Sequence, residues 1–205
     1  MSAATPSPTA LRTRDRIVAA SLTLFNERGI GRVTTAEIAA ASAMREGNLH
    51  YHFPRKSLLV EAIFATFANE AEKVAGHLPA DPEGADALLS YQRAWFDLVW
   101  RYRCVYRDGI AMVEIAPSLR GEVRALRQRT QALARRVFES AAEAGRIRID
   151  HATLSRLLDN AWIVSSHWMN FRLQGKADLD AADLEWGFEQ VRALFLPYLT
   201  PPTTT

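Results

Sequence analysis

Apolar residues recur at every third or fourth position along most of the chain, a spacing that places them on one face of an α-helix. Strict alternation of apolar and polar residues, which indicates half-buried strands, is nearly absent. The pattern therefore predicts an all-α protein with nine helices. We expect these helices at about residues 13–28, 34–42, 46–52, 56–75, 85–102, 105–115, 117–144, 152–173 and 181–196.

Helix-end signals sharpen the start of the chain. Gly29 stands where a left-handed C-cap would end the first helix, a conformation that glycine adopts without strain. Thr34 and Glu37 have the three-residue spacing of a capping box, which begins the second helix. The second and third helices are therefore short and joined by a tight turn, with Ile38, Leu49 and Phe53 as their apolar anchors.

The third helix carries polar and aromatic side chains that suit the major groove of DNA better than an ordinary protein surface. We expect Arg45 to read a guanine edge and Tyr51 to pack on a thymine methyl group. Thr35 and Lys56 stand at the rim, where side chains bind phosphates. This arrangement is typical of a helix-turn-helix, and its expected DNA contacts are Thr34, Thr35, Arg45, Glu46, Gly47, Asn48, His50, Tyr51, His52 and Lys56.

Two residues of this segment leave alternatives open. Glu46 either accepts a hydrogen bond from a cytosine amine or complements the positive end of its own helix. Gly47 costs about 1 kcal/mol of helix stability relative to alanine. Either a close approach to DNA or a packing requirement within the protein would account for that cost.

Composition and charge fit a DNA-binding module on a larger body. Of the 205 residues 48% are hydrophobic, which is enough for a packed core. Residues 1–60 hold eight Lys or Arg against four Asp or Glu, a net charge of +4, whereas the whole chain carries +2. Cys104 is the only cysteine, and neither a secretory signal nor a membrane-spanning run occurs, so we expect the cytoplasm and no membrane contact.

Beyond residue 84 the predicted helices are longer and richer in aromatic residues. Taken singly, each of these residues suits a packed core. Taken together, they also suit an apolar cavity with a few polar anchors, of the kind that encloses a small molecule. The residues expected to line it are Tyr91, Trp95, Trp100, Arg103, Tyr106, Met112, Trp162, His167 and Trp168.

Catalytic chemistry has little support in the sequence. No glycine-rich phosphate loop, nucleophile elbow or acid–base pair is evident. His50 and His52 would lie on different faces of one short helix, and no third ligand is close in sequence. We therefore expect no enzyme, no cofactor and no metal, and a small all-α enzyme is the weakest alternative.

Residues 13–67 resemble the N-terminal domain of the tetracycline-repressor (TetR) family of bacterial regulators. The residues that carry the resemblance are Ile17, Ala20, Phe25, Gly29, Thr34, Thr35, Ile38, Ala39, Gly47, Leu49, His52, Phe53, Lys56, Leu58 and Leu59. The resemblance implies a three-helix DNA-binding head, a linking helix and a variable C-terminal domain that encloses a ligand and dimerises through its last two helices. Past residue 75 the similarity is one of architecture.

Two positions depart from the family pattern. Ala43 stands where the turn usually has glycine, and a left-handed alanine costs about 1 kcal/mol. Arg45 replaces the usual Ser or Thr cap of the third helix, so a capping hydrogen bond is lost or supplied otherwise.

The expected organisation is a disordered arm at residues 1–11, a helix-turn-helix domain at 12–55, a linking helix and C-terminal domain at 56–199, and a disordered tail at 200–205. We expect a homodimer through the last two helices, with Ala161, Ser165 and Gly187 allowing close approach, bound to an inverted-repeat DNA operator. The expected function is a repressor released by a small apolar or amphipathic effector. An orphan DNA-binding regulator without a ligand is the alternative.

Overall fold

The computed structural model describes residues 8–76 and 85–199 and confirms an all-α protein. Ten α-helices and one short 3-10 helix make up the described segments, where the only β-type pairing is an isolated bridge between Ile147 and Leu199. The helices are α1 (Pro8–Arg28), α2 (Thr35–Ala41), α3 (Glu46–His52), α4 (Lys56–Gly76), α5 (Ala85–Arg101), α6 (Arg103–Arg107), α7 (Gly109–Ile115), α8 (Leu119–Glu143), α9 (His151–Leu173) and α10 (Ala181–Phe195). The 3-10 helix, Leu196–Tyr198, follows α10.

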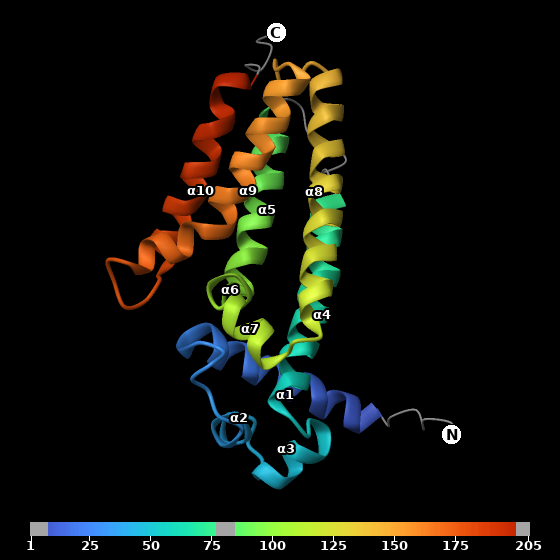
Figure 1. Ribbon diagram of the computed structural model, residues 1–205, viewed down its shortest axis with the longest axis vertical. Helices are drawn as coiled ribbons and strands as arrows, with labels where there is room; N and C mark the ends of the chain where they lie inside the picture. The colour runs from blue at the N-terminus through green and yellow to red at the C-terminus, as the bar shows by residue number, and fades with distance from the viewer. Residues whose placement is uncertain (1–7, 77–84, 200–205) are drawn as a thin grey trace.

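The chain is elongated, with a small three-helix head at one end (Figure 1). Helices α4, α5, α8, α9 and α10 run lengthwise and form the C-terminal domain, while α6 and α7 lie between this domain and α1. The first helix begins at Pro8, earlier than expected, and the remainder of the predicted arm lies outside the described residues, as does the predicted tail.

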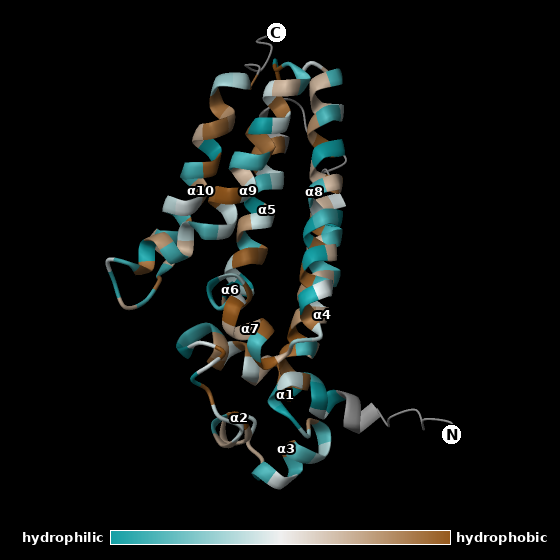
Figure 2. Cartoon of the chain, viewed as in Figure 1, coloured by the Kyte–Doolittle hydropathy of each residue, from teal (hydrophilic) through white to brown (hydrophobic). Residues whose placement is uncertain are grey.

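One hydrophobic core joins the head to the linking helix. Ile17 and Phe25 of α1, Leu49 of α3 and Leu59 of α4 are completely buried in it. Figure 2 shows hydrophobic residues gathered where α1, α4 and α7 meet, and Met112 of α7 belongs to the same cluster. The head is therefore packed directly against the start of the C-terminal domain.

The prediction of a single helix at 105–115, and with it the total of nine helices, is wrong. The chain forms two helices, α6 and α7, because the backbone of Asp108 leaves helical geometry between them (φ −109°, ψ 27°). The Asp108 carboxylate accepts a hydrogen bond from the backbone N–H of Ile30 at 2.9 Å. A long-range contact to the loop after α1 thus divides a segment whose apolar spacing is continuous.

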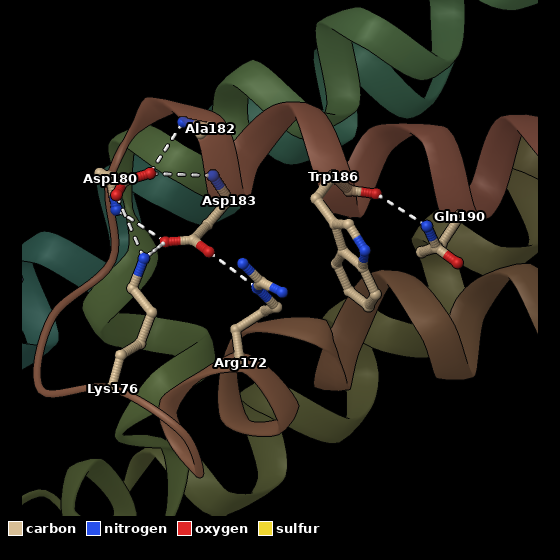
Figure 3. A network of polar contacts seen from close by, with 7 residues as sticks. All are labelled: Arg172, Lys176, Asp180, Ala182, Asp183, Trp186 and Gln190. Carbon is tan, nitrogen blue, oxygen red and sulfur yellow. Dashed lines mark hydrogen bonds and ion pairs between the residues drawn. The ribbon is translucent and has the colours of Figure 1, made fainter.

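A buried carboxylate fixes the connection between α9 and α10. The Asp183 carboxylate is completely buried and accepts hydrogen bonds from Arg172 (2.7 Å), from Lys176 and from the Asp180 backbone (2.9 Å) (Figure 3). Burial alone would raise the pKa of Asp183, but the bonds from Lys176, Asp180 and Arg172 hold this pKa at about 2. The network sets how the last two helices meet.

Candidate nucleic-acid interface and cavity

Local sequence signals place the helix-turn-helix as predicted. The side chain of Thr34 accepts a hydrogen bond from the Glu37 backbone N–H, and the Glu37 carboxylate accepts one from that of Thr34, so the capping box forms. The turn passes through Ala43 at φ 51°, the left-handed conformation that was expected to cost stability. Arg45 stands at the N-cap of α3 without a capping side-chain bond, as expected.

Helix α3 is held by its apolar residues and presents its polar residues to solvent. Leu49 and Phe53 are completely buried. Tyr51 has 84% of its surface exposed, an unusual environment for a large aromatic residue. The other exposed residues of this face are Arg45, Glu46, Gly47, Asn48 and His50.

Glu46 has a partner that neither sequence interpretation anticipated. Its carboxylate accepts a hydrogen bond of 2.6 Å from the Thr35 hydroxyl of α2, and His50 Nε2 lies 3.7 Å from the same oxygen. Glu46 therefore ties α2 to α3. The Thr35 hydroxyl, expected on a phosphate, donates within the protein instead.

Lys56 and His52 also serve the head itself. The Lys56 ammonium donates to the backbone carbonyl of Val33, and burial lowers its pKa. His52 is half-buried, and its backbone carbonyl accepts a hydrogen bond of 2.7 Å from Arg14. The Arg14 guanidinium also lies 4.1 Å from the centre of the Phe53 ring, which fastens α1 to the end of α3.

The surroundings of Gly47 exclude one of the two explanations predicted for it. A Cβ atom built at this position would meet no other atom within 4 Å. Packing inside the protein therefore does not require glycine here. Of the two explanations predicted from the sequence, only close approach of a partner is compatible with this open position.

A surface groove between α1 and α3 extends the interface beyond the predicted residues. Its volume is about 770 Å³, and Arg45, Asn48, Tyr51 and His52 line it from the α3 side. Arg16 lines it from α1, is exposed and was not among the predicted contacts. The signal for Arg16 was available, because it follows two other arginines at two-residue intervals near the start of α1.

The C-terminal domain contains two adjoining cavities. The larger has a volume of about 520 Å³, lies between α5, α8 and α9, and includes the predicted residues Tyr91, Trp95 and Trp162. The smaller, of about 310 Å³, lies nearer the head. Its predicted residues are Trp95, Tyr106, Met112, Trp162 and His167.

Three of the predicted cavity residues lie outside both cavities. Trp168 stacks on Phe96 and on Trp100, with ring centres 6.2 Å and 6.4 Å apart, and it packs against α10 at Gly187. The Arg103 guanidinium covers the Trp100 ring at 4.8 Å. These side chains pack behind the Phe96 wall of the larger cavity through their ring contacts, although the buried Nε1 of Trp168 has no hydrogen-bond partner among the described residues.

The predicted small residues of the dimer interface also face elsewhere. Ala161 and Ser165 are buried and line the larger cavity. Gly187 lies within the chain against Trp168, because a Cβ atom there would come within 2.6 Å of the indole ring. The close approach that Gly187 allows is therefore between α9 and α10 of one chain.

The larger cavity also has polar lining residues that the sequence pattern did not single out. Gln92 lines it from α5 and Arg135 from α8. Gln92 lies one helical turn from each of the completely buried residues Leu88 and Phe96. A polar residue on an apolar face was the available signal for Gln92.

The head and the C-terminal domain meet at a polar contact, which we call the α1–α6 junction. Arg107 donates hydrogen bonds to the Phe25 carbonyl (2.7 Å) and the Asn26 carbonyl (2.9 Å) at the end of α1. Asp108 pairs with Arg107 at 2.9 Å and accepts the Ile30 N–H. Two C-terminal carbonyls of α1 thus share one charged partner, Arg107 of α6.

Other kinds of site find no support in the described residues. No group of three or more His, Cys, Asp or Glu side chains is arranged there to hold a metal ion, and no described helix is long and apolar enough to cross a membrane. Cys104 is completely buried, and burial raises the pKa of its thiol to about 12, which leaves it protonated and unreactive.

Comparison with known proteins agrees with this geometry. A family model described as bacterial regulatory proteins of the tetR family matches residues 17–63, and one described as bacterial transcriptional repressor matches residues 67–205. The chain belongs to the TetR family. As a TetR-family member it is a DNA-binding transcriptional regulator, and α2 and α3 form its helix-turn-helix.

Individual relatives support the same assignment. A TetR-family regulator from Marinobacter aquaeolei VT8 is 34% identical, with 92% of each chain covered and a TM-score of 0.80. A TetR regulator from Chloroflexus aurantiacus J-10-FL, 20% identical, shares the fold with a TM-score of 0.63 over 95% of this chain and 100% of its own. The HTH-type transcriptional repressor KstR2 of Mycolicibacterium smegmatis is 35% identical over 63 residues, which are 31% of this chain and 30% of that repressor.

Proposed function

We propose that this TetR-family regulator is a dimeric cytoplasmic repressor that binds an inverted-repeat operator and is released by a small molecule held in the C-terminal cavities. The observation that carries the proposal is the exposed face of α3, where Arg45 and Tyr51 project while Leu49 and Phe53 fix the helix to the head. Tyr51, 84% exposed, stands beside the exposed Arg45 and Asn48, so this face combines an apolar contact with hydrogen-bonding groups suited to base edges.

The contacts that each side chain makes within the head decide the role that we assign to it at the DNA interface. Arg45, Asn48 and Tyr51 are assigned to base edges, since all three line the groove between α1 and α3. Arg16, on the other wall of that groove, is assigned to a phosphate. Thr35 and Lys56, which donate within the head, act by positioning α2, α3 and α4.

Dimerisation through α9 and α10 is supported by what these helices expose. Ile163 and Phe171 of α9 are 58% and 60% exposed, two helical turns apart on one face. Phe171 stacks on Trp186 of α10 with ring centres 5.8 Å apart, which extends the apolar surface to the second helix. A second copy of the chain is the occupant that would cover this face, as in the dimers by which TetR-family proteins bind their operators.

Coupling between effector and DNA is supported by the position of α6 and α7. Tyr106, Gly109 and Met112 line the smaller cavity, and the intervening Arg107 and Asp108 hold the end of α1. A ligand that displaces these two short helices would alter the α1–α6 junction and the spacing of the two heads. Such a coupling is worth about 1–3 kcal/mol in typical regulators.

In vitro selection of DNA fragments by the purified full-length protein tests the proposal. We expect enrichment of an inverted repeat whose half-sites lie about 34–36 Å apart, or a multiple of that distance. Enrichment of a single half-site, or of no sequence, would contradict a dimer that reads DNA with two α3 helices.

A further inference from the structure

One side chain in the larger cavity lacks the partners that its burial requires. Gln92 is only 5% exposed, and neither its Nε2 donor nor its Oε1 acceptor has a hydrogen-bond partner among the described residues. Gln92 lines the cavity from α5. Burying both polar atoms of an amide without partners is costly, so packing alone favours leucine or methionine at this position.

Two hydroxyl groups of the same cavity wall already have hydrogen-bond partners. The Tyr91 hydroxyl donates to the Ala75 carbonyl at 3.2 Å. The Thr130 hydroxyl donates to the Leu126 carbonyl of its own helix at 3.0 Å. Gln92 therefore differs from Tyr91 and Thr130, two polar residues of the cavity wall whose hydroxyl protons have partners within the protein.

Charge around the cavity favours a neutral ligand. Two positive side chains, Arg135 and Arg136, and two negative ones, Glu139 and Asp159, contribute to the lining. These charges balance, and Arg135 also donates to Ser155 at 3.3 Å. An ionised ligand would gain no net attraction here, and it would leave either the donor or the acceptor of Gln92 unpaired.

Two tryptophan rings, tilted by 45° to each other, form an apolar part of the wall of the larger cavity. Trp95 and Trp162 pack with ring centres 5.9 Å apart and contribute to both cavities. We infer that the larger cavity binds a neutral, largely apolar molecule with one carboxamide-type group, whose adjacent N–H and C=O pair with Oε1 and Nε2 of Gln92. This inference deepens the proposed function, because it names the chemical class of the effector.

Calorimetric titration with three probes of one shape tests the pairing: naphthamide, the corresponding methyl naphthyl ketone and the naphthoate anion. We expect wild type to bind naphthamide at least about tenfold more tightly than the other two, since only naphthamide satisfies both atoms of Gln92. Gln92→Met should abolish this preference. Gln128→Met, which alters another glutamine of the same cavity wall, is the matched control and should retain the preference.

Several results would overturn the inference: no binding of naphthamide, equal binding of the three probes by wild type, or an undiminished preference in Gln92→Met. Thermal unfolding adds an independent readout. Without ligand, Gln92→Met should unfold at a higher temperature than wild type, and a lower temperature would show that the amide is already satisfied in the free protein.

Separate measurements test the ligand preference and the proposed DNA-binding function, so either can be contradicted without the other. Binding of the selected DNA without ligand should be the same for wild type and Gln92→Met. Failure of wild type to bind DNA would contradict the proposed function and leave the calorimetric preference measurable. Normal DNA binding without a preference for naphthamide would contradict only the inference.

Discussion

The head and the C-terminal domain place polar and apolar side chains in opposite ways. In the head, the exposed face of α3 carries Arg45 and Tyr51, while Phe53 is buried. In the C-terminal domain, polar Gln92 is buried among aromatic residues and Ile163 is turned outward. We propose that each of these regions serves a partner: DNA at the head, a small molecule inside the C-terminal domain and a second subunit on its outside.

The largest expected effect comes from removing the outward apolar face of α9. We expect the double variant Ile163→Asp, Phe171→Asp to weaken dimerisation by about a hundredfold or more, because each change occurs twice across a twofold interface. Sedimentation equilibrium measures the change. Ile110→Asp is the matched control, since Ile110 is 77% exposed on α7, outside the proposed interface. A double variant that remains dimeric would remove α9 from the interface.

The second prediction concerns the stability that the buried Asp183 carboxylate provides between α9 and α10. Asp183→Asn should cost about 3 kcal/mol of unfolding free energy, because Arg172 and Lys176 would lose their buried partner. The lowered pKa of Asp183, about 2, means that its stabilisation is complete above its unfolded pKa of about 3.9 and is lost as pH falls through 2. Urea unfolding from pH 7 to pH 2 should therefore show the two proteins converging in acid. A constant difference across that range would contradict the assigned pKa.

Replacing a glycine of the long helices by alanine should change the free energy of unfolding by an intermediate amount, in a direction that depends on the position. Gly187→Ala should destabilise the protein by about 2 kcal/mol, because the new Cβ would meet the Trp168 ring at 2.6 Å. Gly121→Ala on α8 is the matched control: it meets no atom within 4 Å, and it should gain up to about 1 kcal/mol from helix propensity. Chemical denaturation measures both. Equal effects at the two positions would argue against close packing of α9 on α10.

The smallest effect on stability is expected in the head. Gly47→Ala should stabilise α3 by about 0.5–1 kcal/mol, since nothing surrounds the new Cβ. It should nevertheless weaken DNA binding if α3 approaches the bases closely. Unfolding and DNA titration measured on the same preparation separate these two results. Unchanged DNA affinity would remove close approach as the reason for glycine.

The head was predictable because its determinants are close in sequence. Thr34 and Glu37 form their capping box within four residues, and Ala43 takes the left-handed turn that helix-turn-helix geometry demands. What the pattern missed were contacts between elements. The hydrogen bonds from Thr35 to Glu46 and from Lys56 to Val33 depend on how the helices are placed relative to one another. The sequence alone could therefore not distinguish these side chains from side chains that make no contact within the protein.

The cavities were predictable only in part. Aromatic content pointed to Trp95 and Trp162, which line the larger cavity, and equally to Trp100 and Trp168, which stack on each other outside it. All four lie on α5 or α9. The rotation of each helix about its own axis decides which of these side chains line the cavity and which lie outside it. The break between α6 and α7 was missed for the same reason, because Asp108 is drawn toward Ile30, far away in sequence.

We propose above that the exposed face of α3 reads the operator. The most direct measurement is a fluorescence-anisotropy titration of the selected DNA with wild type and with the double variant Arg45→Ala, Tyr51→Ala. Each lost base contact is worth about 1–3 kcal/mol and is lost in both half-sites, so we predict that affinity falls by at least about a hundredfold while the unfolding temperature is unchanged. Arg124→Ala, which removes an exposed arginine of α8, should bind like wild type. A folded double variant that retains wild-type affinity would contradict the claim.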